Sequence, residues 1–244
     1  MHMTKQKTAL VTGANRSIGF EIARRLAAEG YRVWIGSRDV GRGEEAARKL
    51  RDQGLDAHVL QLDVTSDESV ASAIAELSRQ TDHLDALVNN AGIADSFTHQ
   101  PFEEPIEVVK AVYEVNTFGP IRLTQAALPL LKASGAGRVV MLSSELGSLQ
   151  ALLDPQNQFY GINALGYNSS KTALNAVTVS FAKAAEPFGI KVNAADPGYT
   201  KTDMNGHSGY RTVEQAAEAP VRLAMLGPDG PTAGYFFDDH TLPW

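Results

Sequence analysis

Thr12-Gly13-Ala14-Asn15-Arg16-Ser17-Ile18-Gly19 joins the first β-branched run of the chain, Thr8 to Thr12, to its first helix-like segment, Ile18 to Glu29. Glycine in such a turn permits a tight reversal and a close approach of the backbone to a ligand. The N-terminus of the following helix offers free N–H groups, which bind phosphate oxygens well. An ordinary strand-to-helix loop remains open as the alternative, but the position of the turn favours a phosphate-binding βαβ unit.

Short β-branched runs and longer helical segments alternate along the rest of the chain. The strands expected are Thr8 to Thr12, Arg32 to Ile35, Ala57 to Gln61, Leu84 to Val88, Arg138 to Leu142 and Ile190 to Ala194. The helices expected include Ile18 to Glu29, Glu44 to Gln53 and Ser66 to Gln80. Such alternation predicts an α/β fold with a doubly wound, mostly parallel sheet and helices on both faces. No linker or repeat interrupts it, so we expect residues 1–244 to form a single domain.

Two loop-rich stretches follow strands in the second half of the chain, Gly147 to Gly166 and Pro197 to Thr212. Open α/β sheets bind their ligands beyond the carboxyl ends of the strands. We therefore expect the two stretches to build a substrate pocket. An apolar lining for this pocket is suggested by Leu146, Leu149, Leu152, Leu153 and Phe159. Packing in the core or within the loop would explain the same residues.

The composition excludes several classes of function. The chain has 244 residues, 43% of them hydrophobic, and a formal charge of −6, which gives no basic field for nucleic acid or anionic lipid. It contains no cysteine, which excludes disulfides, thiolate metal sites and cysteine nucleophiles. Met1 to Lys7 hold no signal-like apolar run, and no stretch approaches the roughly 18 apolar residues of a membrane helix. We expect a cytoplasmic protein with small-molecule partners.

The end of the second expected strand carries a signal for the choice of nucleotide. Dinucleotide-binding folds place there either a carboxylate for the NAD ribose or a basic residue for the NADP 2′-phosphate. Ser37 and Arg38 favour the phosphate, and Arg16 in the glycine turn would supply a second cation. Asp39 is the counter-argument, because its carboxylate could accept a ribose hydroxyl. Both arginines could instead be ordinary solvated surface residues.

Further motifs follow successive strands in a fixed order, and together they are highly specific: Thr12 to Gly19, Asp63-Val64, Asn89-Asn90-Ala91-Gly92, Asn116, Ser143-Ser144, Tyr167 to Lys171, and Pro197-Gly198 with Thr200 and Thr202. In this series the chain resembles the short-chain dehydrogenase/reductase family over nearly its whole length, and the carbonyl-reductase-like branch within it. The resemblance implies a Rossmann-type fold and an NADPH/NADP+ cofactor.

The residues that the resemblance and the nucleotide signals assign to cofactor binding are Gly13, Asn15, Arg16, Ser17, Ile18, Gly19, Ser37, Arg38, Asp63, Val64, Asn90, Ala91, Gly92, Tyr167, Lys171, Pro197, Gly198, Thr200 and Thr202. One position departs from the family, which commonly has glycine where this chain has Ser17. A serine is tolerable there if its backbone is not left-handed, and its hydroxyl could contact phosphate. We expect binding to be retained.

Tyr167 is the candidate acid and base of the reaction. Reduction of a carbonyl needs a hydride on carbon, which a nicotinamide supplies, and a proton on oxygen, which the protein must supply. Lys171 stands four residues later, on the same helical face, where its charge would lower the high pKa of a phenol. The resemblance implies that Lys171 also holds the nicotinamide ribose. Tyr160 has Ala164 instead of lysine four positions on, so we expect it to pack or to line the pocket.

Two further side chains complete the expected catalytic set. Ser144 would hydrogen-bond the substrate carbonyl and the developing alkoxide, and motif position favours it over Ser143. By resemblance, Asn116 would help to organise a proton relay to Lys171. The alternatives are that the serine simply ends a strand and that Asn116 is a buried residue whose amide forms hydrogen bonds with the backbone.

Tyr167 stands 23 positions after Ser144, which is longer than is usual in the family. We therefore expect an insertion within Gly147 to Gly166, which could cover the pocket or alter subunit association. A homo-oligomer and a monomer both remain open.

The sequence thus predicts an NADPH-dependent oxidoreductase that reduces a ketone or aldehyde to an alcohol, reversibly. The alternatives are an NAD-linked alcohol dehydrogenase and a non-catalytic nucleotide-sensing protein. We assign no metal site, because His207, Asp238, Asp239 and His240 lack a compact ligand spacing.

Overall fold

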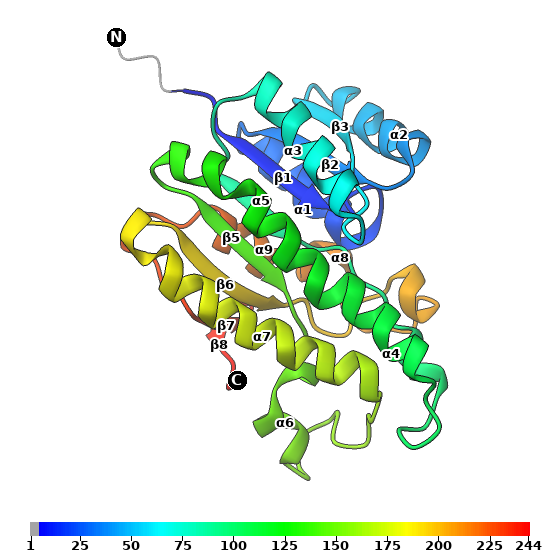
Figure 1. The fold of residues 1–244 in the computed structure, drawn as a ribbon. Helices are drawn as coiled ribbons and strands as arrows, with labels where there is room; N and C mark the ends of the chain where they lie inside the picture. The colour runs from blue at the N-terminus through cyan, green and yellow to red at the C-terminus, as the bar shows by residue number, and fades with distance from the viewer. Residues whose placement is uncertain (1–4) are drawn as a thin grey trace.

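A computed structural model describes residues 5–244. Met1 to Thr4, which belong to the segment expected not to be a signal peptide, lie outside the described residues. One eight-stranded sheet runs through the molecule in the order β3-β2-β1-β4-β5-β6-β7-β8 (Figure 1). Its strands are β1 (Thr8–Thr12), β2 (Arg32–Ser37), β3 (Ala57–Gln61), β4 (Ala86–Asn89), β5 (Arg138–Leu142), β6 (Lys191–Asp196), β7 (Tyr235–Phe237) and β8 (His240–Thr241). All neighbouring pairs are parallel except β7 and β8.

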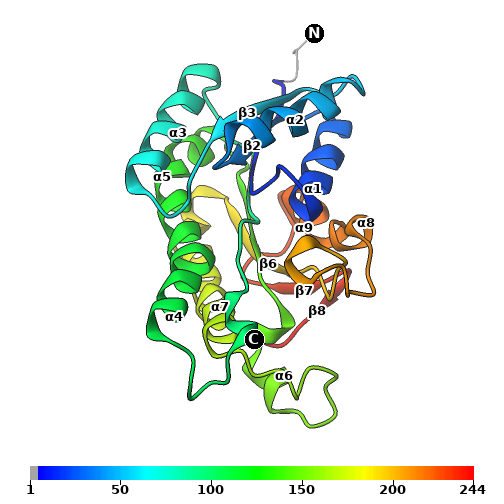
Figure 2. The same ribbon diagram turned by 90° about the vertical axis from the view of Figure 1, so that its right-hand side faces the viewer.

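The helices cover both faces of the sheet. They are α1 (Ser17–Ala28), α2 (Val40–Arg51), α3 (Asp67–Gln80), α4 (Ile106–Tyr113), α5 (Gly119–Ser134), α6 (Leu149–Leu153), α7 (Leu165–Ala185), α8 (Val213–Ala216) and α9 (Glu218–Ala224). Figure 2 shows α3, α4, α5 and α7 on one side of the sheet and α1, α2, α8 and α9 on the other. Each face has its own apolar core, one centred on Ile22, Leu26 and Leu50, the other on Leu77, Leu123 and Leu131.

The expected α/β class, the mostly parallel sheet and the two helical layers are confirmed. Three strands have the expected bounds, β1, β3 and β5, and β2, β4 and β6 differ from the expected strands only at their ends. The strands β7 and β8 were not expected. The main error in the first half is α2, which begins at Val40 instead of Glu44 because the Asp39 carboxylate caps it by accepting from the Arg42 N–H at 3.0 Å.

The strand order places the carboxyl ends of β1 and β4 side by side, although β1 continues to β2 in the chain. At such a switch point the connections on either side leave the sheet toward opposite faces, which opens a crevice. The ends of β5 and β6 continue the same edge. These four strand ends position the candidate site.

Candidate active site

The turn between β1 and α1 is closely packed against the end of β4. A side chain at Gly19 would place its Cβ 2.4 Å from the Asn90 Nδ2 atom and 2.7 Å from the Gly13 carbonyl oxygen, so only glycine fits. Gly13 has a φ of +63°, a left-handed value that glycine adopts without strain. The first and last glycines of the expected motif therefore serve the turn as the sequence predicts.

Ser17 does not meet the condition under which a serine would be tolerated without strain. Its φ is +50°, which lies in the left-handed region. A side chain with a β-carbon in that region costs about 1–2 kcal/mol. The departure from the family glycine thus introduces local strain at the first residue of α1.

Asn90 and Thr12 join the two central strand ends. The Asn90 amide nitrogen donates to the Thr12 carbonyl oxygen at 2.7 Å, and the backbone N–H groups of Asn90 and Ala91 both donate to the Thr12 hydroxyl at 2.9 Å. This network fixes the backbone of residues 90–92 along the crevice. Pre-organised backbone of this kind is what a cofactor cleft requires.

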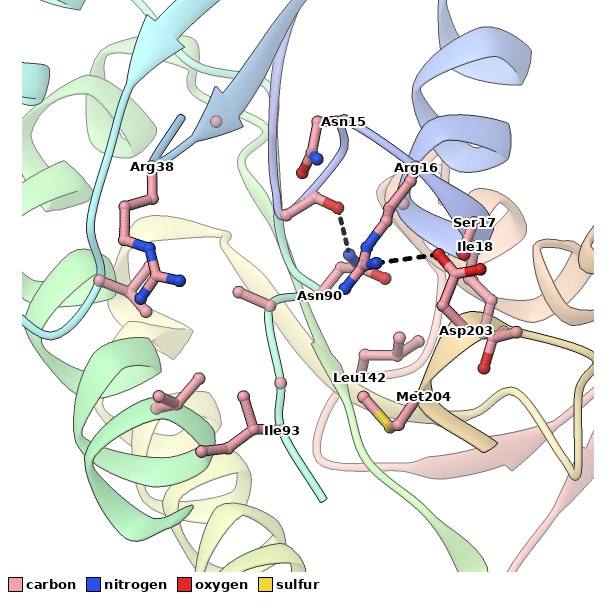
Figure 3. A pocket seen from close by; sticks show the side chains of 18 of the residues that line it. Asn15, Arg16, Ser17, Ile18, Arg38, Asn90, Ile93, Leu142, Asp203 and Met204 are labelled. Carbon is pink, nitrogen blue, oxygen red and sulfur yellow. Dashed lines mark hydrogen bonds and ion pairs between the residues drawn. The ribbon is translucent and has the colours of Figure 1, made fainter. Parts of the chain in front are cut away.

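A first cavity of about 320 Å³ follows the crevice between the glycine turn and α7 (Figure 3). The expected cofactor residues that line it are Gly13, Asn15, Arg16, Ser17, Ile18, Gly19, Arg38, Asp63, Val64, Asn90, Ala91, Gly92, Tyr167, Lys171, Pro197 and Thr202. Three others lie elsewhere. Ser37 is buried and donates to the Asp39 carbonyl oxygen at 2.7 Å, whereas Gly198 and Thr200 line a second cavity.

Sequence reasoning missed several residues of this first cavity, namely Gly36, Leu62, Thr65, Ile93, Val115, Leu142, Ser143, Asp203 and Met204. Most of them are neighbours of an expected residue at a strand end, so the strand pattern itself could have indicated them. Asp203 and Met204 belong to a short 3-10 helix, Asp203–Asn205, which carries no sequence signal for a cleft.

The nucleotide-discriminating end of the cavity is basic. The Arg38 side chain points into the cavity in Figure 3. The Asp39 carboxylate is engaged by α2, where it accepts from the Arg42 N–H at 3.0 Å and lies 3.5 Å from the Arg42 Nε atom. Because Asp39 does not line the cavity, the counter-argument for NAD loses its structural basis.

Asp63 and Arg16 have partners within the protein. Asp63 accepts from the Thr65 N–H at 3.0 Å and from the Thr65 hydroxyl at 2.7 Å. Although burial acts to raise the pKa of Asp63, these hydrogen bonds give it a net lowering. Arg16 forms an ion pair with Asp203 at 2.9 Å across the opening of the cavity (Figure 3). Arg16 thus lines the cavity as a member of an ion pair and not as a free cation.

Tyr167 and Lys171 lie together at the far end of this cavity, on α7. The Lys171 Nζ atom lies 5.6 Å from the centre of the Tyr167 ring and donates to the Leu142 carbonyl oxygen, at the end of β5, at 2.7 Å. Lys171 is buried, and burial lowers its pKa to about 8 while the charge of Asp196 acts in the opposite direction.

The expected lowering of the Tyr167 pKa is wrong as a net effect. Burial raises the pKa of Tyr167 to about 12, and a hydrogen bond with Ser144 offsets only part of that rise. The reason is that desolvation of the phenolate exceeds the favourable interactions around it. Tyr167 is therefore protonated at neutral pH, as a proton donor must be.

The two adjacent serines have different surroundings. The Ser143 hydroxyl donates to the Asn175 Oδ1 atom at 2.6 Å and is buried in the protein. Ser144 lines the second cavity together with Tyr167, with which it shares a hydrogen bond. This arrangement supports Ser144 over Ser143 as the carbonyl ligand.

Asn116 sits in a π-helical turn, Glu114–Phe118, and connects the segment after β4 to α7. Its Oδ1 atom accepts from the Ile93 N–H at 2.9 Å, and its Nδ2 atom donates to the Ile93 carbonyl oxygen at 3.0 Å and to the Ser170 hydroxyl at 3.2 Å. These bonds satisfy the amide internally. A role in a proton relay remains a prediction.

The second cavity, of about 590 Å³, opens beyond Tyr167 and Ser144. Both loop-rich stretches contribute to it, as expected, through Leu146, Gln158, Phe159 and Ile162 around the first and Tyr199, Thr200, Met204, Asn205 and Ser208 from the second. Phe97, which sequence reasoning missed, also lines it and lies 5.1 Å from the Tyr167 ring, centre to centre.

Three expectations about this cavity need correction. Leu149 and Leu153, on α6, are 58% and 78% exposed and do not line it. Leu152 is also outside its lining. Tyr160, expected to pack or to line the pocket, is 54% exposed and lies outside it as well. Leu149, Leu153 and Tyr160 lie on the exposed surface of residues 147–166, and Leu152 is half-buried there.

Residues 5–244 contain neither a cluster of metal ligands nor a membrane-spanning helix. No group of three or more His, Cys, Asp or Glu side chains within them is placed to hold a metal ion. No helix among the same residues combines the length and the apolar character that crossing a membrane requires.

Known proteins resemble this chain over almost its whole length. (+)-Neomenthol dehydrogenase of Arabidopsis thaliana is 37% identical over 284 residues, covering 94% of this chain and 95% of that protein. Carbonyl reductase (NADPH) 1 of Mus musculus is 33% identical over 281 residues, covering 99% of each. The structure of NADPH-bound carbonyl reductase from chicken fatty liver has a TM-score of 0.86 at 28% identity, covering 99% of this chain and 100% of that chain.

A family model described as short chain dehydrogenase matches residues 7–211. That range includes the glycine turn, Tyr167, Lys171 and the whole crevice between them. The ordered motifs, the strand order and this match agree, and the chain belongs to the short-chain dehydrogenase/reductase family.

Proposed function

We propose that the protein reduces a ketone or aldehyde to an alcohol with NADPH, in a reaction that is reversible in principle. Relatives named as reductases and dehydrogenases support the reaction class, and the mouse and chicken carbonyl reductases carry NADPH in their names. The observation that carries the proposal is a single cavity lined at one end by Arg38 and at the other by Tyr167 and Lys171.

The residues around this first cavity fit NADPH. Gly13 and Gly19 bring backbone close to the position of a pyrophosphate, at the N-terminus of α1. Arg38 supplies the cation that a 2′-phosphate requires. At Gly92, a Cβ would lie 3.3 Å from the Asn116 Oδ1 atom and 3.9 Å from the Lys171 Nζ atom. The absence of a side chain there leaves the space beside the catalytic lysine open.

When bound, NADPH supplies a hydride to the carbonyl carbon. Ser144 donates a hydrogen bond to the carbonyl oxygen and orients it toward Tyr167. Tyr167 then transfers its phenolic proton to the oxygen as negative charge develops there. The Lys171 ammonium stabilises the phenolate that remains and holds the nicotinamide ribose, and Asn116 supports the relay that returns a proton.

A pKa of about 12 keeps the Tyr167 phenol in its protonated form at neutral pH. The phenol is almost fully protonated there and can donate. Oxidation of an alcohol would need the phenolate as a base, and that form is rare below the pKa.

The alternative of an NAD-linked dehydrogenase rests on Asp39, whose carboxylate caps α2 outside the first cavity. A panel of ketones, aldehydes and quinones, followed by NADPH absorbance with NADH in parallel, tests the reaction and the cofactor together. Reduction of several carbonyls with a preference for NADPH is the expected result. Failure of every carbonyl to oxidise either cofactor would refute the proposal.

Arg38→Ala isolates the phosphate contact. Loss of a charged hydrogen bond to the 2′-phosphate should weaken NADPH binding about tenfold or more, with little change for NADH. Fluorescence titration of both cofactors measures this. Arg48→Ala, on α2 and with its side chain 63% exposed, serves as the control. Equal losses for NADPH and NADH would remove the phosphate-binding role.

A further inference from the structure

Asp196, the last residue of β6, is a carboxylate on the wall of the second cavity that the proposed mechanism does not use. It is 4% exposed and lines the same cavity as Ser144 and Tyr167. Its Oδ1 atom accepts from the Gly198 N–H at 2.9 Å. The negative charge of Asp196 acts to raise the pKa of both Tyr167 and Lys171.

No Lys, Arg or His within residues 5–244 forms an ion pair with Asp196. Arg211, whose charge acts to lower the pKa of Asp196, is held by Asp238 through two hydrogen bonds of 3.0 and 2.6 Å. Burying a carboxylate without an ion-pair partner is unfavourable. Such a charge on the wall of a ligand cavity indicates a functional role.

A second carboxylate adjoins the first. Glu145 also lines this cavity, and its negative charge acts to raise the pKa of Asp196, although burial is the larger cause. Hydrogen bonds from the backbone of Gly198 and of Glu145 act in the opposite direction. The Glu145 Oε1 atom accepts from the Asn157 amide nitrogen at 2.6 Å, and Glu145 too has no ion-pair partner among the chain's described residues. Lys171 is the cation on the catalytic side, so this corner of the cavity holds two carboxylates against one ammonium.

The remaining walls suit an organic cation with apolar substituents. Phe97, Phe159 and Tyr199 line the second cavity and offer aromatic faces and edges. Aromatic faces attract ammonium groups through the negative charge at the centre of the ring face. A volume of about 590 Å³ is in the range of sites that hold drug-sized ligands.

We propose that the substrate is an amino ketone, with Asp196 and Glu145 holding its ammonium group while Ser144 and Tyr167 hold the adjacent carbonyl. This inference rests on the proposed carbonyl reduction and adds the chemical class of its substrate. Asp196 is then a specificity-determining residue, and the reaction remains the same hydride and proton transfer.

Two ketones of nearly the same shape test the charge alone. One is 1-phenyl-2-(trimethylammonio)ethanone, a permanent cation, and the other is 3,3-dimethyl-1-phenylbutan-1-one, in which a carbon replaces the nitrogen. The readout is the ratio of kcat/KM for the cationic ketone to kcat/KM for the neutral one. Comparing this ratio between wild type and variants cancels the different intrinsic reactivity of the two carbonyls.

Asp196→Asn should lower the ratio about tenfold or more, and Glu145→Gln should lower it by a smaller factor. Asp239→Asn, whose side chain is 83% exposed outside the second cavity, changes the net charge equally and should leave the ratio within about twofold. Thermal unfolding and NADPH titration show whether each variant is folded. Should Asp196→Asn not fold, Glu145→Gln alone still decides the test.

An unchanged ratio in Asp196→Asn and Glu145→Gln, with the neutral ketone still reduced, would overturn the inference and leave carbonyl reduction standing. An equal fall in kcat/KM for both ketones would also overturn the inference. That result would mean that Asp196 acts through Lys171 and not on the charge of the substrate. Absence of NADPH oxidation with either ketone in the wild type, together with failure of the wider carbonyl panel, would refute the proposed function itself.

Discussion

At the scale of single residues, Ser17 departs from the glycine of the family motif and introduces backbone strain. Its place at the start of α1, in the glycine turn, could be predicted from the sequence. Its backbone conformation could not, because a left-handed φ of +50° depends on how residues 13–19 pack against Asn90. Strain of this kind is common at ligand sites and is supported by the surrounding fold.

Ser17→Gly should increase the free energy of unfolding by about 0.5–1 kcal/mol, because glycine adopts the same φ without a β-carbon. For a chain of this size the melting temperature should rise by about 1–4 °C, which thermal unfolding measures. Ser72→Gly, at an exposed position within α3, is the control and should destabilise by about 0.5 kcal/mol. A lower melting temperature for Ser17→Gly would show that the serine contributes more than its strain costs.

The candidate catalytic residues could be named from the sequence, but their electrostatics could not. The sequence separation of Tyr167 and Lys171 predicts that they share a helical face, and they do. The net direction of the Tyr167 pKa depends on burial by segments far away in the chain, including β5 and the loop after β6. Asp196 escaped notice for the same reason, since its burial and lack of a cation are properties of the assembled cavity.

At the scale of elements, the alternating strands and helices of the first half follow from local periodicity. The short β7 and β8 were not predicted, because strands of three and two residues carry little pattern of their own. The segment between β6 and α8 was expected as a loop near the substrate, with Pro197, Gly198, Thr200 and Thr202 assigned to the cofactor. It bears a short 3-10 helix, Asp203–Asn205, that contributes Asp203 and Met204 to the first cavity.

The base of this segment is closed by backbone pairing between Thr200 and Arg211. The Lys201 N–H donates to the Arg211 carbonyl oxygen at 2.9 Å, and the Tyr210 N–H donates to the Tyr199 carbonyl oxygen at 3.0 Å. Gly209 lies inside this closure, where a Cβ would fall 2.3 Å from the Thr200 carbonyl carbon. No side chain fits at that distance.

Gly209→Ala should therefore displace residues 200–211 and lower kcat/KM for carbonyl reduction about 10- to 100-fold, as misplaced binding groups do. Because the segment is peripheral to both apolar cores, the melting temperature should change little. Gly227→Ala, at a glycine with open space around its missing Cβ, should retain wild-type kinetics. Steady-state kinetics of both variants measure these effects. A kcat/KM for Gly209→Ala equal to that of the wild type would contradict this account.

At the scale of the whole molecule, the site joins parts of the chain that sequence patterns cannot connect. Arg16 and Asp203, which pair across the cavity opening, are 187 positions apart. Arg16 was predictable as a cation of the glycine turn, whereas its partner depends on how the segment after β6 folds back over α1. The sheet order that brings them together follows from the βαβ pattern, but the contact itself does not.

Burial of Asp196 has a consequence for the stability of the whole molecule. The pKa of Asp196 is raised from 3.8 to about 6, chiefly by burial. A raised carboxyl pKa means that the unfolded state ionises first, so stability is lost as pH rises from about 4 to about 6 and stays reduced above it. Asp196→Asn removes this loss.

The stability of Asp196→Asn relative to the wild type should increase by about 1 kcal/mol between pH 5 and pH 7.5. Urea unfolding at the two pH values measures the difference. Asp239→Asn, at an exposed carboxylate, should show no such change with pH. A parallel pH dependence for Asp196→Asn and the wild type would mean that the carboxylate is not buried as described.

Tyr167→Phe tests the central claim, that Tyr167 donates the proton in carbonyl reduction. The variant keeps the ring that packs against Phe97 and loses only the hydroxyl. Turnover in the carbonyl panel should fall by about 10²- to 10⁴-fold, the usual contribution of a general acid, while NADPH affinity by fluorescence titration stays within about twofold. Turnover near the wild-type value in Tyr167→Phe would contradict the assignment.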